Sequence, residues 1–298
     1  MKYTNKNKFN KIISEWLRND TYDHEEGVLS ATALLKPIKS IQLMRKHWND
    51  IEIDIENLIA SRLGTAIHDS FEKIQLKNFI QEQRYYAEID GQKISGKFDF
   101  LEKLPDKKHK LSDLKTTSVW AFVYGSNIDI TIKQLSIYRW LGHQNGLDII
   151  DTANIIYVFT DWSRAKARKG GGYPAHRCAV KTIKLLSLAE TETYIKDRIK
   201  VILSDDMPDC TDSELWKSED KIKVFKDGNK TASKICDTKE QARDYIHFAS
   251  TANLLKGKTP KYTIDIVKGK VGRCNYCDVR LFCDQYKQLL SNDMIKEE

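Results

Sequence analysis

Proline and long apolar runs are scarce in this sequence, and its first 177 residues contain no cysteine. Only 5 of the 298 residues are proline, while 41% are apolar and 31% charged, a composition typical of a folded chain with a sizeable core. No apolar run approaches the roughly 20 residues that a membrane-spanning helix requires. The first ten residues are polar and lysine-rich, without the apolar stretch of a secretory leader, so we expect a cytoplasmic protein with no membrane contact.

The sequence also lacks the phosphate-binding loop G-x-x-x-x-G-K-[ST], which excludes a motor ATPase of that class. Lys and Arg outnumber Asp and Glu by 49 to 42, and the resulting net charge of +7 permits nucleic-acid binding without demonstrating it. In the cytoplasm, the six cysteines are expected to be free, catalytic or metal-bound rather than disulfide-paired. Particular residues, rather than composition, must therefore identify the chemistry.

The hydrophobic pattern predicts an α/β fold with a mixed central sheet flanked by helices. Residues 1–60 are expected to form a helical N-terminal region, with helices at 8–17 and 34–48. Residues 61–205 are expected to form the core. It begins with a helix over 61–79 and continues with strands at 85–89 and 93–100 that meet at the turn Asp90-Gly91. A strand at 110–116, a helix at 130–142 and a buried strand at 152–160 follow.

The rest of the core is expected to contain a basic, glycine-rich loop at 164–177, a strand at 178–183 and a helix at 188–203. Residues 206–298 are expected to form a separate α/β subdomain. Its predicted elements are strands at 221–225 and 231–235 around the turn Asp227-Gly228, a helix at 238–255, and a terminal cysteine cluster.

Two acidic residues on neighbouring predicted strands indicate a metal site. Asp113 and Lys115 are two residues apart on one strand, so their side chains project from the same face. Asp99 lies between Phe98 and Phe100, and if those rings face the core, its carboxylate faces the other way. When the two strands pair, the carboxylates converge into a hard oxygen site suited to Mg²⁺ or Mn²⁺. A lysine beside them can hold the attacking water and offset phosphate charge.

Two helices carry further polar pairs at i, i+4 spacing. His68 and Glu72 share one face of the 61–79 helix, where the histidine can supply a nitrogen ligand. Glu72 fits either an active-site carboxylate or a solvated surface residue. Gln134 and Tyr138 repeat the spacing on the later helix, where they can meet a phosphate or base, or simply cover the core.

Several of these residues occur in ordered motifs. Gly64-Thr65-Ala66-Ile67-His68 comes first, then Ser95-Gly96-Lys97-Phe98-Asp99, then Asp113-Leu114-Lys115-Thr116-Thr117, and finally Gln134 with Tyr138. In this order the sequence resembles the PD-(D/E)XK nuclease superfamily, which has a restriction-endonuclease-like core. It is most similar to the RecB-type branch that includes Fe–S nucleases of recombination and CRISPR adaptation. The resemblance covers about residues 61–160 together with the cysteine cluster.

The resemblance implies a role for each motif residue. His68, Asp99, Asp113 and the Leu114 carbonyl would be metal ligands, and Lys115 would be the catalytic lysine. Gln134 and Tyr138 would lie near the DNA.

The cysteine cluster Cys274-x₂-Cys277-x₅-Cys283 has a first pair spaced like a metal-binding knuckle. It resembles the C-terminal half of the Fe–S nucleases. Those enzymes take a fourth cysteine from before the histidine motif, where this chain has none. We favour Cys210 as the fourth ligand because it precedes a helix-capping pattern; Cys236 and Cys178 are the alternatives. Four thiolates suit a [4Fe–4S] cluster or, as the alternative, Zn²⁺.

A basic run follows the core strands. Trp162 and Tyr173 flank its central charges, and its glycines predict a mobile loop. Such a loop suits phosphate contacts and base stacking on a single strand, although a solvated surface loop would have the same composition. The candidate DNA-binding residues are Arg164, Lys166, Arg168, Lys169 and Arg177.

Together these features predict a Mg²⁺- or Mn²⁺-dependent deoxyribonuclease, with exonuclease action favoured over endonuclease action. Its substrate would be single-stranded DNA or duplex ends, in recombination, repair or phage DNA processing, and its partners would be recombination or replication proteins. The alternative is a catalytically silent DNA-binding or assembly module with a structural metal knuckle. Intact acidic and lysine positions favour the enzyme.

Overall fold

The computed structural model describes residues 1–19 and 25–296, and these form two compact units. The core unit comprises Met1–Gln42 and Glu52–Met207, and the C-terminal unit comprises Leu43–Ile51 and Pro208–Glu298. Among the described residues, no helix has both the length and the apolar character needed to span a bilayer.

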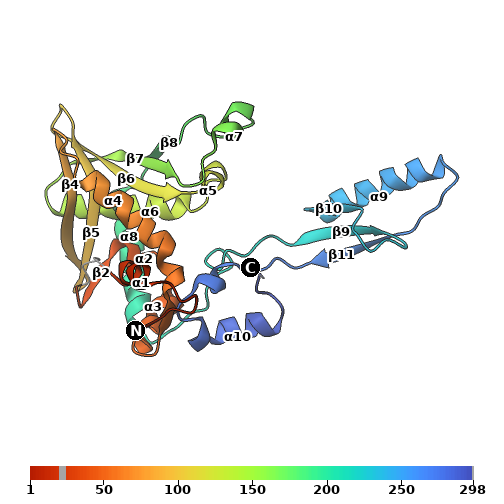
Figure 1. The fold of residues 1–298 in the computed structure, drawn as a ribbon, viewed down its shortest axis with the longest axis horizontal. Helices are drawn as coiled ribbons and strands as arrows, with labels where there is room; N and C mark the ends of the chain where they lie inside the picture. Colours follow the sequence, from red (N-terminus) through yellow and green to blue (C-terminus); the bar gives the residue numbers. More distant parts are fainter. Residues whose placement is uncertain (20–24, 297–298) are drawn as a thin grey trace. The chain divides into compact units, whose positions relative to one another are not determined.

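A six-stranded mixed sheet organises the core unit. Its order is β2-β5-β6-β7-β8, and β4 pairs with β5. The β2–β5 and β6–β7 pairs are parallel, whereas β4–β5, β5–β6 and β7–β8 are antiparallel. The strands are β2 (Val28–Ser30), β4 (Phe79–Ile89), β5 (Gln92–Lys103), β6 (His109–Thr117), β7 (Ile149–Phe159) and β8 (Cys178–Lys184). This arrangement, flanked by helices, confirms the predicted α/β class (Figure 1).

The remaining elements of the core unit are helices and a small two-stranded sheet. The helices are α1 (Lys11–Arg18), α2 (Ala31–Leu34), α3 (Ile38–Lys46, whose last residues belong to the C-terminal unit), η1 (Ile55–Leu58), α4 (Ile59–Glu72), α5 (Val119–Val123), α6 (Ile128–Gln144), α7 (Arg164–Lys169) and α8 (Leu188–Leu203). The small sheet pairs β1 (Lys2–Thr4) with β3 (Glu52–Asp54) in parallel.

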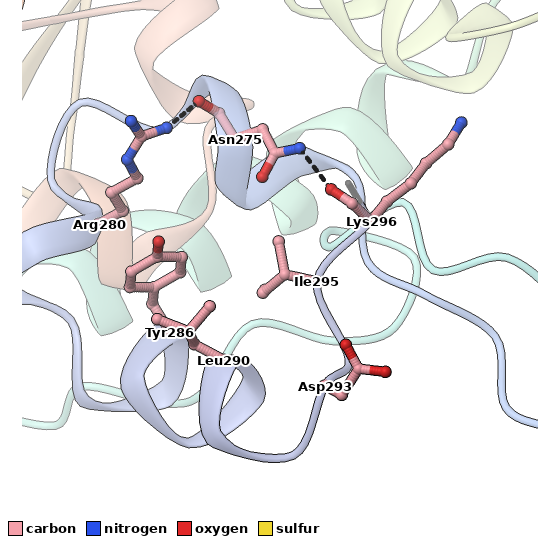
Figure 2. Close-up of a pocket in the computed structure, with 7 residues that line it drawn as sticks. All are labelled: Asn275, Arg280, Tyr286, Leu290, Asp293, Ile295 and Lys296. Carbon is pink, nitrogen blue, oxygen red and sulfur yellow. Dashed lines mark hydrogen bonds between the residues drawn. The ribbon is translucent and has the colours of Figure 1, made fainter. Parts of the chain in front are cut away.

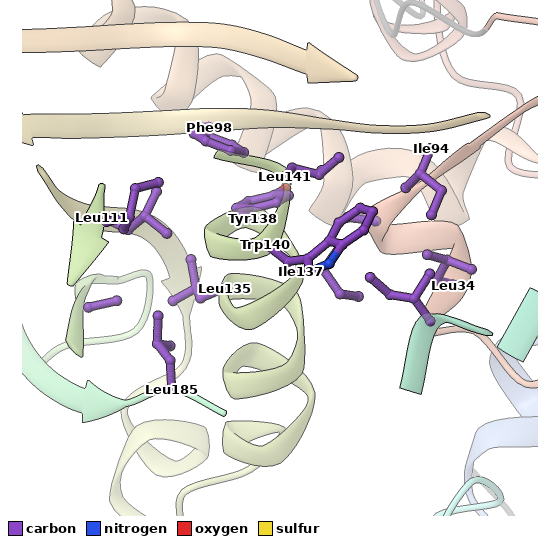
Figure 3. Packing of buried hydrophobic residues seen from close by; sticks show 14 of the residues in the cluster. Leu34, Ile94, Phe98, Leu111, Leu135, Ile137, Tyr138, Trp140, Leu141 and Leu185 are labelled. Atoms are coloured by element: carbon purple, nitrogen blue, oxygen red, sulfur yellow. The ribbon is translucent and has the colours of Figure 1, made fainter. Parts of the chain in front are cut away.

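Helix α6 is the centre of the main hydrophobic core. Its residues Leu135, Ile137, Tyr138 and Leu141 are buried in one cluster with strand residues such as Phe98 (Figure 3). The Phe98 and Tyr138 rings lie 5.0 Å apart between centroids. This close approach depends on Gly96 of β5, because a Cβ there would lie only 2.7 Å from Leu141 Cδ1 and 2.8 Å from Tyr138 Cδ1.

The structure corrects the predicted helix over 61–79. Helix α4 ends at Glu72, and β4 already begins at Phe79, so the chain between them is not helical. Leu63 and Ile74, two apolar residues at helical spacing within the predicted helix, are exposed. The apolar residues at helical spacing therefore extend past the end of α4, and they do not form one buried face.

Three further expectations need correction. The helix expected over 34–48 is interrupted before α3 by Pro37, which disfavours the helical conformation of Lys36. The expected loop at 164–177 begins as a short helix, α7. The N-terminal region is not purely helical, because β2 joins the central sheet through Val28–Ser30.

The C-terminal unit contains a three-stranded antiparallel sheet, ordered β10-β9-β11, with α9 beside it (Figure 1). Its elements are β9 (Lys221–Lys226), β10 (Lys234–Cys236), α9 (Lys239–Leu254), β11 (Tyr262–Val267), η2 (Arg273–Tyr276), η3 (Arg280–Phe282) and α10 (Asp284–Ser291). Strand β11, which alternates polar and apolar residues, was missed by the sequence analysis. Below, residues 221–268 are called the arm.

The two ends of the arm meet at a set of hydrogen bonds. Ser218 N donates to Lys270 O at 3.0 Å, and Lys270 N donates to Ser218 Oγ at 3.0 Å. Gly269 N donates to the Asp220 carboxylate at 2.9 Å. The arm is therefore an excursion that leaves and re-enters the cysteine-containing segment at one point.

We predict that Gly96→Ala lowers the free energy of unfolding by about 1–3 kcal/mol, because the added methyl overpacks the contact between β5 and α6. Urea denaturation followed by circular dichroism would measure it. Gly272→Ala is the matched control, since its φ is −100° and its added Cβ would meet nothing closer than 3.9 Å. Equal midpoints for the two variants would contradict the close packing of α6 on β5.

Candidate active site

The candidate site lies where β5 and β6 separate. One edge of β5 pairs with β2 at residues 93–95 and with β6 at residues 100–103, and among the described strands none pairs with that edge at 96–99. The last ladder pair, Phe100 with Ser112, places Asp99 opposite Asp113. Beyond that pair the backbone ladder stops, and Leu114 N donates to Asp99 Oδ2 at 2.7 Å instead. The two predicted acidic residues therefore stand at the mouth of the opening.

Asp99 lies in an environment that opposes its negative charge. Its side chain is only 12% exposed. Burial, followed by the charge of Asp113, raises the pKa of Asp99 to about 8, even though the bond from Leu114 N acts in the opposite direction. A cation between the two carboxylates would relieve this penalty.

Asp113 is buried more deeply, at 2% exposure. Its Oδ1 accepts from Lys115 Nζ at 3.2 Å. Its Oδ2 lies 2.9 Å from the same nitrogen but outside hydrogen-bond geometry, and no group in the described part of the chain donates to it. The Lys115 ammonium compensates the charge of this carboxylate, but Oδ2 accepts no hydrogen bond from the described groups and stays open to an oxygen-seeking cation.

A hydrogen-bonded chain runs from Lys115 into α6. Lys115 Nζ donates to Gln134 Oε1 at 3.1 Å, and Gln134 Nε2 donates to the Tyr138 hydroxyl at 2.9 Å. Gln134 and Tyr138 are 8% and 6% exposed, so the structure places them beneath Lys115 rather than at a surface that could touch a base. Their i, i+4 spacing thus serves to fix the lysine.

Lys115 carries a positive charge in this setting. Burial alone would lower its pKa, but the charge of Asp113 and the hydrogen bond to it outweigh that effect, and the pKa is raised. About a third of the side chain is exposed at the opening. Lys115 can therefore orient water and offset phosphate charge, whereas a proton-accepting role would need a lowered pKa.

His68 reaches the site from α4. The helix passes close to β6 at Gly64, where an added Cβ would lie 3.3 Å from Thr116 Oγ1. His68 Nε2 lies 3.0 Å from the Leu114 carbonyl oxygen, which can only accept, so Nε2 carries the proton. His68 Nδ1 lies 3.8 Å from Asp99 Oδ2. An ion bound by both His68 Nε2 and the Leu114 carbonyl would replace the proton they now share.

Glu82 of β4 is a site residue that the sequence analysis missed. Ligand atoms of His68, Glu82 and Asp99 all lie within 4.8 Å of one another. Glu82 has a φ of 51°, uncommon for a non-glycine residue, and Lys97 holds its carboxylate at 2.7 Å. The predicted strand began only at Tyr85, so the one available signal, a polar Gln81-Glu82-Gln83 run, was not assigned to the sheet.

Other predicted residues lie outside this group. Glu72, the last residue of α4, is exposed, and its charge acts on Lys97. Asp113 is not within 4.8 Å of all three members, although its charge acts on Asp99. The basic residues Arg164, Lys166, Arg168 and Lys169 are exposed on α7, and Arg177 is exposed just before β8.

The four cysteines predicted as ligands gather in the C-terminal unit. Burial, followed by the charges of Glu214 and the other three thiols, raises the pKa of Cys210 to about 12. Burial and the charges of Cys277 and Cys283 raise the pKa of Cys274 to about 11. Thiols that raise one another's pKa in this way lie close together. Of the alternatives, Cys236 is buried in the arm and Cys178 is exposed on β8 of the core unit.

Helix α10 and the segment that carries His47 both contact the chain around this cysteine cluster. Gln285 of α10 bonds both backbone groups of Cys210, and Tyr286 N donates to Cys283 Sγ at 3.5 Å. His47 stacks on Phe282 with the two rings 4.2 Å apart and nearly parallel. Beside the cluster is a small pocket (Figure 2), lined by Asn275, Arg280, Tyr286, Leu290, Asp293, Ile295 and Lys296.

Comparisons with known proteins give similarities to solved structures. No protein-family model matches the sequence, and no curated protein matches it. The structure named SSO0001 is 18% identical, with a TM-score of 0.45 over 64% of this chain and 84% of that one. A phage-related exonuclease from Haemophilus somnus 129PT is 16% identical, with a TM-score of 0.37 over 58% of this chain and 91% of that one.

We predict that Asp99→Asn keeps or raises the thermal midpoint of the protein in EDTA, because the neutral amide avoids the buried charge and still accepts from Leu114 N. The same variant should lose most of the rise in midpoint that Mn²⁺ gives the wild type. Thermal unfolding with and without Mn²⁺ measures both effects. Asp106→Asn, on an exposed loop, is the control. A large loss of stability in EDTA would mean that Asp99 is a structural residue.

Proposed function

We propose that the chain is a metal-dependent deoxyribonuclease that hydrolyses phosphodiester bonds with Mg²⁺ or Mn²⁺. The observation that carries this proposal is a pair of carboxylates where β5 and β6 separate, buried Asp113 and largely buried Asp99, with protonated Lys115 beside them. A purely structural ion pair would not need a second carboxylate whose pKa is raised by burial and by the charge of the first.

The side chains present fit a divalent cation. Asp113 Oδ2 is a buried oxygen that accepts no hydrogen bond from the described groups. Asp99, Glu82 and His68 each offer a metal-ligand atom, and these three atoms lie within 4.8 Å of one another. Oxygen donors suit Mg²⁺ and Mn²⁺, and the histidine nitrogen suits Mn²⁺ better. We assign His68, Glu82, Asp99, Asp113 and the Leu114 carbonyl as the residues that would hold it. Such an ion supplies Lewis acidity and lowers the pKa of water.

The chain's own residues then have separate roles. The Lys115 ammonium offsets the charge that develops on the phosphate and orients the attacking water. Gln134 is a positioning residue, because its side chain holds the lysine and is itself held by the Tyr138 hydroxyl. Asp113 holds the ammonium from the other side. Lysine and carboxylates are thereby preorganised before DNA arrives.

The positively charged surface of α7 is the reason for assigning DNA as the substrate. In the described part of the chain, none of Arg164, Lys166, Arg168 and Lys169 has an ion-pair partner, so all four cations are available to phosphates. The more specific assignment is an exonuclease that acts in recombination, repair or phage DNA processing, with recombination or replication proteins as partners, and it rests on the resemblance of the motifs.

We predict that Asp113→Asn and Lys115→Ala each lower the cleavage rate about 100-fold or more. Lys115→Ala removes the positive charge beside the reacting phosphate, and Asp113→Asn removes a negative charge that would hold the cation and the lysine. Glu82→Gln should lower the rate as well if Glu82 helps to hold the ion. The assay is degradation of end-labelled DNA with Mg²⁺ or Mn²⁺, and Asp106→Asn is the control.

Substrates with one blocked end would separate exonuclease from endonuclease action. Pure wild-type protein that leaves DNA intact with either metal, while binding it, would replace the nuclease with a DNA-binding or assembly module. Full activity in Asp113→Asn would overturn the site assignment.

We also propose that Cys210, Cys274, Cys277 and Cys283 hold a structural [4Fe–4S] cluster, with zinc as the alternative. Four sulfurs around one zinc ion lie about 3.8 Å apart, given a tetrahedral Zn–S bond of about 2.3 Å. Among the described residues, no three of these sulfurs lie within 4.8 Å of one another. The thiolates of a four-iron cluster bind separate irons and so lie farther apart, which favours the cluster.

We predict that anaerobically purified protein is brown and contains about four irons per chain. Cys210→Ser should lower the iron content and destabilise the C-terminal unit, whereas Cys178→Ser, on exposed β8, should change neither. Absorbance and metal analysis measure the content. Colourless protein with one zinc would select the alternative, and iron unchanged by Cys210→Ser would move the fourth ligand elsewhere.

A further inference from the structure

Helix α5 begins two residues beyond the end of the catalytic strand, β6, and it turns two aromatic side chains outward. Ser118 caps its first turn by accepting from Ala121 N at 3.2 Å. Phe122 packs inward between Tyr157 and Phe159, with ring centroids 4.9 and 5.1 Å away. Trp120 and Tyr124 project from the other side of the short helix and are 43% and 77% exposed. Phe122 anchors the helix, so the two exposed rings are not needed for its packing.

The exposed rings form an ordered surface. Trp120 and Tyr124 stack with centroids 5.7 Å apart and planes 21° apart, and Tyr173 meets Trp120 edge-on at 5.9 Å. Tyr173 is held by its hydroxyl, which accepts from Ser163 N at 2.9 Å. We call Trp120, Tyr124 and Tyr173 the aromatic platform. Flat rings kept at a surface and held from behind can stack nucleobases at little entropic cost.

The aromatic platform lies at the same edge of the sheet as the active-site lysine. Strands β6 and β7 are parallel, so α5 and α7 both follow carboxyl ends of strands. Thr160 N donates to Thr117 O at 3.0 Å, and Val119 N donates to Asp161 Oδ1 at 2.7 Å, which ties the two strand ends together. Trp120 follows Lys115 by five residues. Ligands of α/β sheets bind at this edge.

The charge around the aromatic platform suits the backbone of a nucleic acid. Residues 162–177 contain five Lys and Arg residues and no acidic residue, and they include Tyr173. Trp162, which the sequence analysis also considered for stacking, is occupied instead: its indole N–H donates to Pro174 O at 3.0 Å, and Arg177 lies over its ring. Trp120 and Tyr124 are therefore the residues available to stack on bases, and the cations of α7 are those available to contact phosphates.

We propose that the aromatic platform binds unpaired nucleotides, so that the substrate entering the site is single-stranded DNA or the frayed end of a duplex. This inference rests on the proposed nuclease function for its choice of DNA. Bases within an intact duplex are stacked on one another and cannot lie on the rings, whereas unpaired bases of any sequence can. The basic surface of α7 supplies affinity that does not depend on bases.

The test separates bases from phosphates. In an Asp113→Asn background, binding is measured by fluorescence anisotropy for oligo(dT), for an abasic strand of the same length, and for a blunt duplex. Trp120→Ala with Tyr124→Ala should weaken oligo(dT) binding about tenfold or more and leave abasic and duplex binding nearly unchanged. Replacing Arg164, Lys166, Arg168 and Lys169 with Gln should weaken all three, with a salt slope lower by about 0.7 per lost contact on a single strand.

Trp16→Ala with Tyr3→Ala is the matched control, because Trp16 is 41% exposed and Tyr3 37% exposed elsewhere in the core unit. Binding of all three ligands unchanged in the platform variant, or weakened equally for all three, would overturn the proposal. If wild-type protein cleaves DNA but binds oligo(dT) and the abasic strand equally well, the proposal for the aromatic platform is wrong and the proposed nuclease function is retained. If wild-type protein does not cleave DNA and only the platform variant loses base-dependent binding, the proposed nuclease function is wrong and the proposal for the aromatic platform is retained.

Discussion

The hydrogen bond from Leu114 N to Asp99 determines the geometry of the whole site. At this point in a regular sheet, the amide would bond to the backbone of β5 and close the ladder. A side-chain carboxylate takes that place instead, at 2.7 Å, and the two strands can diverge without leaving a buried amide unsatisfied. The same carboxylate therefore both allows the strands to separate and lines the opening between them.

Other parts of the core unit are arranged around that divergence. Helix α4 can bring His68 to the Leu114 carbonyl because Gly64 lets it lie close to β6. On β4, Glu82 leaves regular extended conformation and turns its carboxylate toward Asp99. Helix α6 supports Lys115 from beneath through Gln134. Three elements, α4, β4 and α6, thus each bring one polar side chain to the opening or to the lysine beside it.

Sequence patterns were informative where one residue type fixes one local conformation. The Asp90-Gly91 turn predicted the β4–β5 hairpin, which the structure contains. The register that places Asp99 opposite Asp113 belongs to the separate β5–β6 pairing, which that turn does not determine. Glu82 was not predictable in this way, because its role depends on a left-handed backbone conformation inside a strand. The orientation of Asp99 was inferred from buried Phe98 and Phe100. Both rings are buried, but Phe98 packs on Tyr138 of α6 and Phe100 on Phe71 of α4. Where helices cover both faces of a sheet, burial alone does not fix the direction of a side chain.

The closed base of the arm has a consequence for how the molecule is divided. Because residues 218–220 and 269–270 are bonded to one another, the chain between them can be shortened to a tight turn without separating Cys210 from the later cysteines. The arm also holds eleven Lys and Arg residues against five Asp and Glu residues, which is +6 of the chain's net +7. A chain without it would be almost electrically neutral. The net charge of the protein is therefore concentrated in one segment, whereas all six strands of the central sheet lie outside it, so removal of the arm would shift the isoelectric point without taking a strand from that sheet.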